Sequence, residues 1–120
     1  MLCSCYHFSL DIRYLHKENT GVYMTIRVLG LIELQDQSAF ELYRAQVGNT
    51  VELYQGSIQS RGTVTEIFWN ELCCGAFSAF VELHFPTQAL AHAWAHSPEY
   101  QALVSIRNKA MKLTLFGVAI

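Results

Sequence analysis

The chain is 120 residues long, the usual length of one domain, which excludes a multidomain enzyme with a separate cofactor lobe. Its hydrophobic content is 52% and its charged content 15%. Typical soluble domains are roughly 25% charged, so we expect a partner to cover part of the surface. The net charge of −2 gives no positive field for phosphate backbones or anionic lipid, and argues against nucleic acid or a membrane as a partner.

Residues 1–23 show neither helical nor strand periodicity, and we interpret them as an N-terminal extension that is poorly ordered or not translated, with translation beginning at Met24. The start of the chain lacks the basic region of a signal peptide. The four cysteines form two close pairs rather than the spread of a disulfide framework. We therefore expect a soluble, cytoplasmic protein in which residues 24–120 form a single domain.

The first half of this domain predicts a strand, a helix and a second strand. Residues 26–34 carry apolar side chains at both alternating positions, which is typical of a central strand covered on both faces. Asp36 or Ser38 can cap the next segment, where apolar residues recur every three or four positions and predict an amphipathic helix ending near Gly56. Residues 58–69 alternate between polar and apolar and predict a strand with one wet or cavity-lining face.

The second half predicts a strand, further helices and a last strand. Residues 77–85 have a wholly apolar face and form the third strand. Thr87 can cap a short helix, and Ser97 followed by proline and an acid begins a second one that continues to Met111. Residues 113–120 close the chain as the fourth strand. The order βαββαβ predicts an α+β, ferredoxin-like sandwich, with a four-stranded antiparallel sheet and two helices on one face.

The other face of this sheet would present Leu29, Leu31 and Phe80 to water. Burying each such side chain stabilises a protein by about 1.5–3 kcal/mol, so we expect a homodimer that packs sheet to sheet about a two-fold axis and encloses a cavity. Strict alternation also projects several polar side chains onto this open face, which makes it the predicted binding site. They are Arg61, Thr63, Thr65, Glu82 and His84.

Several motifs resemble the family catalogued as domain of unknown function 1330. They are Phe85-Pro86-Thr87, Trp94, the run from Ser97-Pro98-Glu99-Tyr100 to Leu103, and Arg107, which follow that family's F-P-S, tryptophan, S-P-E-Y and arginine. Tyr54-Gln55-Gly56 and Arg61-Gly62 are similar to its Y-G-G and R-G-G elements. The likeness covers Thr25 to about Val118, with His84 in place of the acid that usually precedes F-P. It implies the dimeric α/β-barrel superfamily, which includes small monooxygenases and isomerases.

Three hypotheses for the function follow. The first is a homodimer that binds a small anionic or carbonyl-bearing molecule on the open face, anchored by Arg61 with Thr63, Glu82 and His84 around it. The second is a cofactor-independent monooxygenase or isomerase, in which His84 removes a proton and Arg61 stabilises the oxyanion. The third is a structural assembly module.

Each candidate residue also has a structural interpretation. His84 can be a hydrogen-bonded residue at a strand end, and Arg61 can form an ion pair across the dimer with Glu82. Arg107 lies on the apolar stripe of the last helix, where we expect a packed stem and a head paired with Glu99 or a backbone carbonyl. His92 and His96 lack a third ligand, so we predict no metal and no cofactor.

Overall fold

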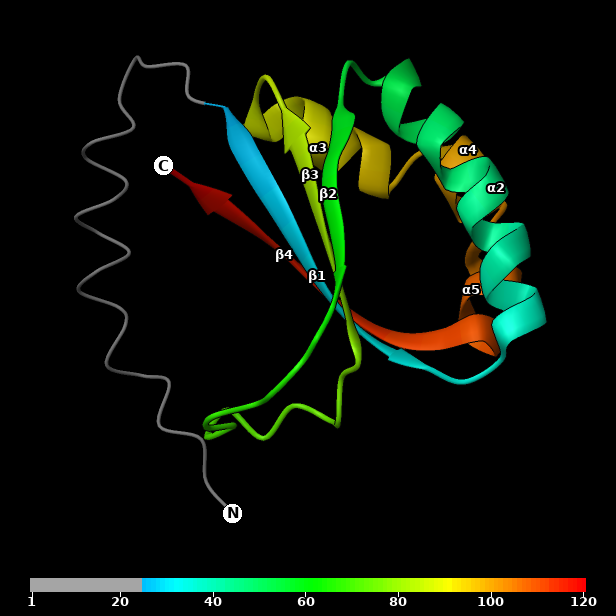
Figure 1. Ribbon diagram of the computed structural model, residues 1–120. Coiled ribbons are helices and arrows are strands. Elements are labelled where there is room, and N and C mark those ends of the chain that lie inside the picture. The colour runs from blue at the N-terminus through cyan, green and yellow to red at the C-terminus, as the bar shows by residue number, and fades with distance from the viewer. Residues whose placement is uncertain (1–24) are drawn as a thin grey trace.

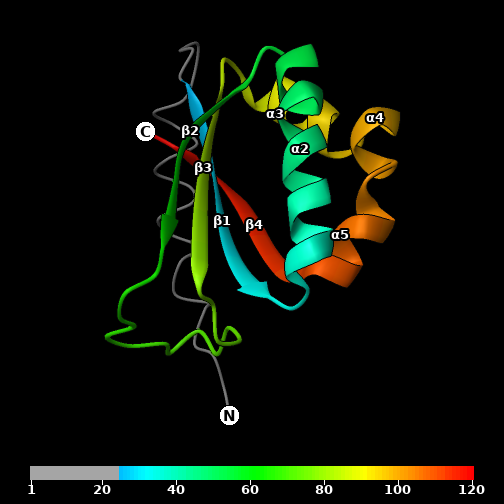
Figure 2. The same ribbon diagram turned by 45° about the vertical axis from the view of Figure 1, so that its right-hand side comes forward.

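The computed structural model describes residues 25–120, which form a four-stranded antiparallel sheet with helices on one face (Figures 1 and 2). The strand order is β2-β3-β1-β4. This confirms the predicted α+β, ferredoxin-like fold. The expectation for residues 1–23 lies outside the described residues. The elements are β1 (Ile26–Leu34), α2 (Gln37–Leu53), β2 (Ser57–Thr63), β3 (Ala79–Phe85), α3 (Gln88–Ala95), α4 (Pro98–Gln101), α5 (Val104–Ala110) and β4 (Met111–Ala119).

Helix α2 begins and ends where local chemistry requires it. Of the two predicted caps, Asp36 is the one used: its side chain accepts a hydrogen bond from the Ala39 backbone N–H at 3.0 Å. After the helix, Gln55 takes a φ of 66° and Gly56 follows. A Cβ on Gly56 would lie 2.5 Å from the Phe85 ring, so only glycine lets the chain pass this close to β3.

The helical region after β3 is shorter and more broken than predicted. Thr87 caps α3 by accepting from the Leu90 N–H at 3.1 Å, and Ser97 caps α4 by accepting from the Tyr100 N–H at 3.0 Å, both as expected. The predicted continuous helix to Met111 is interrupted, because the Leu103 N–H bonds to the carbonyl of Tyr100, three residues back instead of four. No helix in residues 25–120 combines the length and the apolarity needed to cross a bilayer.

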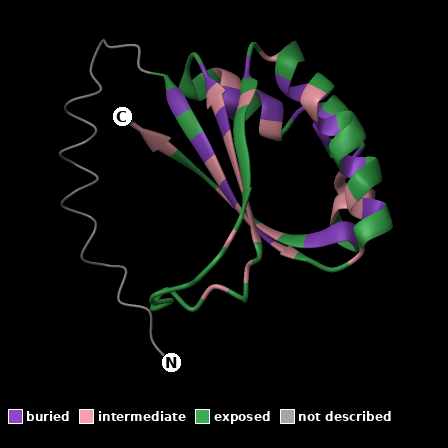
Figure 3. Ribbon diagram, viewed as in Figure 1, coloured by how far each residue is buried: buried purple, intermediate pink, exposed green. Residues whose placement is uncertain are grey.

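The core lies between the sheet and the helices (Figure 3). Ile26, Val28 and Ile32 of β1 face the helices and are buried. Leu29 and Leu31 alternate with these residues and lie on the opposite face of the sheet, as predicted. There Leu29 pairs with Glu82 and Leu31 with Phe80. None of the described helices covers that face, and Leu29, Leu31 and Phe80 are only partly buried.

The connection between β2 and β3 differs from the prediction. Strand β2 ends at Thr63, six residues before the predicted end, because its one neighbour, β3, begins only at Ala79. Residues 64–78 form a long connection that extends beyond the sheet (Figure 1). It carries large exposed apolar side chains, among them Phe68 at 72% and Trp69 at 81% exposed.

Candidate functional site

Strand β2 contains a β-bulge that decides where its side chains point. Ile58 pairs with Leu83, a core residue on the helix side of the sheet. The next pair along the ladder is Ser60 with Glu82, so Gln59 is an extra residue opposite no partner of its own. Because side chains alternate from one face to the other, one extra residue reverses the face of every residue after it.

The bulge separates four of the five predicted site residues into two groups, and the fifth, Thr65, lies beyond the end of β2 in the connection. Arg61 pairs with Val81 and so faces the helices, as does Thr63 two positions later. Glu82 and His84 lie on the open face. The predicted common face was therefore wrong: strict alternation from Ser57 puts all four side chains together, and the inserted residue moves two of them through the sheet.

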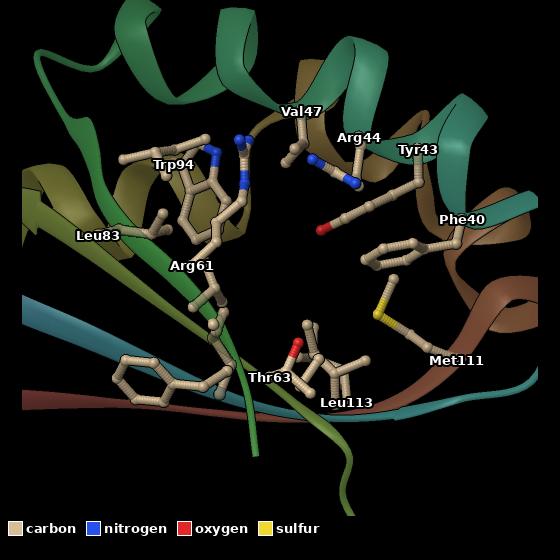
Figure 4. Close-up of a pocket in the computed structure, with 17 residues that line it drawn as sticks. Phe40, Tyr43, Arg44, Val47, Arg61, Thr63, Leu83, Trp94, Met111 and Leu113 are labelled. Carbon is tan, nitrogen blue, oxygen red and sulfur yellow. The ribbon is translucent and has the colours of Figure 1, made fainter. Parts of the chain in front are cut away.

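A cavity of about 300 Å³ lies between α2 and the helix side of the sheet (Figure 4). This volume is at the lower end of the range for small-molecule sites. Its walls are mainly apolar, with Phe40 and Val47 from α2, Trp94 from α3, and Met111 and Leu113 from β4. Such a space fits a compact, largely apolar molecule.

Two arginines, Arg44 from α2 and Arg61 from β2, are the charged residues that line the described cavity, and both are exposed, at its solvent side. The Arg44 Nη1 lies 3.7 Å from the Glu41 carboxylate, and its guanidinium lies 5.6 Å from the centre of the Phe40 ring. Arg61 has no hydrogen bond or ion pair with any residue in 25–120. An unpaired guanidinium beside an apolar space is suited to bind a carboxylate or another oxyanion.

A chain of three polar groups borders the cavity. The hydroxyls of Tyr43, which lines it, and Tyr100 lie 2.9 Å apart, and Arg107 Nη1 donates to the Tyr100 oxygen at 3.0 Å. Burial, followed by the proximity of Tyr100, raises the pKa of Tyr43 far above its ordinary value, so its hydroxyl stays protonated. The predicted partner of Arg107 was wrong: Glu99 instead accepts a hydrogen bond from the Tyr54 hydroxyl at 2.8 Å.

The open face carries a separate polar cluster around Glu82. Its Oε2 lies 2.6 Å from His84 Nε2 and 3.9 Å from Arg27 Nε, and Ser60 Oγ donates to its Oε1 at 3.5 Å. The hydrogen bond with His84 is the main cause that lowers the pKa of Glu82. Glu82 and His84 thus interact, as the sequence allowed, but within one chain the sheet lies between them and Arg61.

The remaining candidates form no site among the described residues. The rings of His92 on α3 and of His96, the residue that caps the end of this helix, lie 4.3 Å apart. No group of three metal-ligating side chains gathers in residues 25–120. Cys73 and Cys74 are free thiols in the β2–β3 connection.

Sequence reasoning missed Arg44 and the contact between Tyr43 and Tyr100. The signal for Arg44 was present, because it lies four residues after Phe40 and three before Val47, on the apolar stripe of α2. No sequence signal pairs Tyr43 with Tyr100, since the two are brought together only when α4 packs beside α2.

The family described as Domain of unknown function (DUF1330) matches residues 27–119. The chain belongs to the DUF1330 family. No curated protein matches its sequence significantly.

Solved structures share the fold of this DUF1330 chain at low sequence identity. A protein of unknown function from Rhodopseudomonas palustris has a TM-score of 0.69 and 16% identity, over 92% of each chain. SnoaB, a cofactor-independent oxygenase from Streptomyces nogalater, has a TM-score of 0.58 and 7% identity, over 81% of this chain and 93% of its own. A dimeric ferredoxin-like protein of unknown function from Thermobifida fusca has a TM-score of 0.55 and 14% identity, over 82% and 92%.

Proposed function

We propose that this DUF1330 protein is a homodimer that binds a small, largely apolar molecule with a carboxylate or similar oxyanion in the cavity under α2. The observation that carries the proposal is Arg61, whose guanidinium lies unpaired among the described residues at the solvent side of an apolar cavity of about 300 Å³. Arg44 on the facing helix adds a second positive charge. The anionic group would lie between the arginines and the apolar part against Trp94 and Val47.

The homodimer is supported by the open face of the sheet. Leu29, Leu31 and Phe80 lie there without a covering helix among the described elements, and Phe116 of β4 is 43% exposed. Packing two such faces together removes this apolar surface from water. The Thermobifida fusca protein, described as dimeric, has the same fold.

The enzymatic alternative receives less support from the arrangement of residues. It requires His84 as a base and Arg61 as the oxyanion partner of one substrate, and these two side chains lie on opposite faces of the sheet. The oxygenase from Streptomyces nogalater shares the fold, which by itself carries no activity. A purely structural module would have no use for an unpaired arginine beside an apolar cavity, so we favour binding.

The test uses 4-isopropylbenzoate as the probe and its neutral analogue 4-isopropylbenzyl alcohol. Two-dimensional ¹H–¹⁵N spectra report each indole N–H separately. Trp94 is the reporter, because it lines the cavity and is 2% exposed. Trp69 is the internal control, because it lies in the connection between β2 and β3 and is 81% exposed. We expect the carboxylate to shift the Trp94 signal saturably while Trp69 stays in place. The alcohol should bind more weakly.

Arg61→Gln should weaken carboxylate binding by about 1 kcal/mol, a factor of about five, since an exposed charge-assisted bond is lost. Its affinity for the alcohol should stay unchanged. Arg27→Gln is the matched control, because it removes the same charge from the open face. The proposal is wrong if the carboxylate leaves Trp94 unshifted, or if both substitutions weaken its binding equally.

A further inference from the structure

The direction of the hydrogen bond between Tyr43 and Tyr100 follows from the position of Arg107. A guanidinium only donates, so the Tyr100 oxygen accepts the bond from Arg107 at 3.0 Å. The Tyr100 hydroxyl has a single hydrogen, and the Tyr43 oxygen at 2.9 Å is its one acceptor among residues 25–120. Tyr100 is 2% exposed, and buried hydroxyls pair with an acceptor. Tyr100 therefore donates and Tyr43 accepts.

This direction leaves the hydrogen of the Tyr43 hydroxyl unused. Its oxygen is occupied by Tyr100, and no other described residue accepts from it. Tyr43 lines the cavity, and Figure 4 shows its hydroxyl end directed toward the middle of that space. Because burial raises the pKa of Tyr43, the hydroxyl remains a donor and does not become a phenolate.

We propose that Tyr43 is a specificity-determining hydrogen-bond donor that selects ligands carrying a carbonyl or similar acceptor oxygen in addition to their anionic group. The inference rests on the proposed function and narrows the class of ligand from apolar anions to oxo acids and related molecules. Arg107 and Tyr100 act as positioning residues, since they fix which way the Tyr43 hydrogen points.

The test compares probes that differ only in the acceptor. Isopropyl and acetyl groups have nearly the same size, but only the acetyl group carries a carbonyl oxygen. We would measure the affinities of 3- and 4-acetylbenzoate and of 3- and 4-isopropylbenzoate from the Trp94 indole signal. In at least one of the two ring positions, the wild-type protein should prefer the acetyl probe by roughly threefold to tenfold.

Tyr43→Phe should abolish this preference while the isopropyl probe still binds and still depends on Arg61. The preference is the ratio of the affinities of one variant for the acetyl and isopropyl probes. A general loss of stability lowers both affinities equally and so leaves this ratio unchanged. Equal affinity for both probes in both positions, or a preference that survives in Tyr43→Phe, would overturn the inference and leave the proposed function intact. If no carboxylate shifts Trp94, the proposed function fails and the inference falls with it.

Arg107→Met tests the positioning role without altering the lining of the cavity. With Arg107 gone, the Tyr100 oxygen is free to accept from Tyr43, and the Tyr43 hydrogen can turn away from the ligand. We expect a reduced preference for the acetyl probe and unchanged binding of the isopropyl probe. A preference equal to that of the wild type would show that Arg107 does not orient the pair.

Discussion

Every buried side-chain nitrogen and oxygen atom in residues 25–120 has a hydrogen-bond partner, and Thr50 provides one such contact in the core. Thr50 lies on α2 and is 7% exposed; its hydroxyl donates to the Val47 carbonyl at 2.7 Å and accepts from Trp94 Nε1 at 3.0 Å. One hydroxyl thus allows an indole N–H to be buried beside the cavity.

Thr50→Val should lower the free energy of unfolding by about 1–3 kcal/mol, because it keeps the shape but leaves the Trp94 N–H buried without an acceptor. Urea denaturation measures the change. Thr65→Val is the control, since it makes the same substitution in the exposed connection after β2 and should cost less than about 0.5 kcal/mol. Equal losses in the two variants would contradict the role of Thr50.

The bond between Tyr54 and Glu99 predicts a pH dependence. Accepting from the Tyr54 hydroxyl is the main cause that lowers the pKa of Glu99 below its ordinary value near 4.5. The folded state therefore holds the Glu99 proton less tightly than the unfolded chain does. The resulting stabilisation is complete above the ordinary value and is lost as the pH falls through the lowered one.

Tyr54→Phe should consequently be less stable than the wild type at pH 7, and this deficit should shrink as the pH is lowered below about 4.5. The pKa of Glu99, followed by carboxyl ¹³C NMR, should rise in the variant toward its ordinary value. A deficit of the same size at pH 3 and pH 7 would contradict the assignment.

At the scale of the element, helix α2 supplies one wall of the cavity and depends on its cap. Asp36→Ala removes the acceptor for the Ala39 N–H and should destabilise the protein by about 0.5–2 kcal/mol in thermal or urea unfolding. Ser38→Ala is a matched control, because Ser38 was the other candidate cap and makes no capping bond in α2. The prediction fails if the serine variant loses as much stability as the aspartate variant.

Elements with a strong local signal could be predicted from the sequence. The first strand was predicted at Ile26–Leu34, where it lies. Apolar residues occupy both odd and even positions there, which indicates a strand covered on both faces. Thr87 and Ser97 marked helix starts because their hydroxyls cap them. The apolar open face followed from the same alternation in β1 and β3.

The site was predicted less well than the fold, for a reason that lies in β2. Polar residues alternate along this strand from Ser57, and alternation is the only signal that a sequence offers for the face of a side chain. The bulge at Gln59 depends on pairing with β3, which is a contact between distant residues, and no turn residue marks it. Strict alternation therefore assigned Arg61 and Thr63 to the wrong side of the sheet.

At the scale of the whole molecule, the open face predicts the mass in solution. Light scattering should give twice the 13.6 kDa of one chain. Leu31→Arg should halve this mass, because it places a charge in the middle of the apolar face. Leu42→Arg makes the same change on the exposed side of α2, at a leucine that is 56% exposed, and should leave the mass unchanged. A wild-type mass of one chain would refute the homodimer.

The bulge in β2 bears on how such proteins diverge. A regular ladder, with Gln59 paired to Glu82, would carry Arg61 and Thr63 across to the open face and remove from the cavity the cation that we propose binds the ligand, with every amino acid retained. A one-residue shift in pairing is thus able to exchange recognition chemistry for assembly chemistry without any change in the length of the chain. Relatives should be compared by whether this bulge is present before they are compared by their residues at these positions.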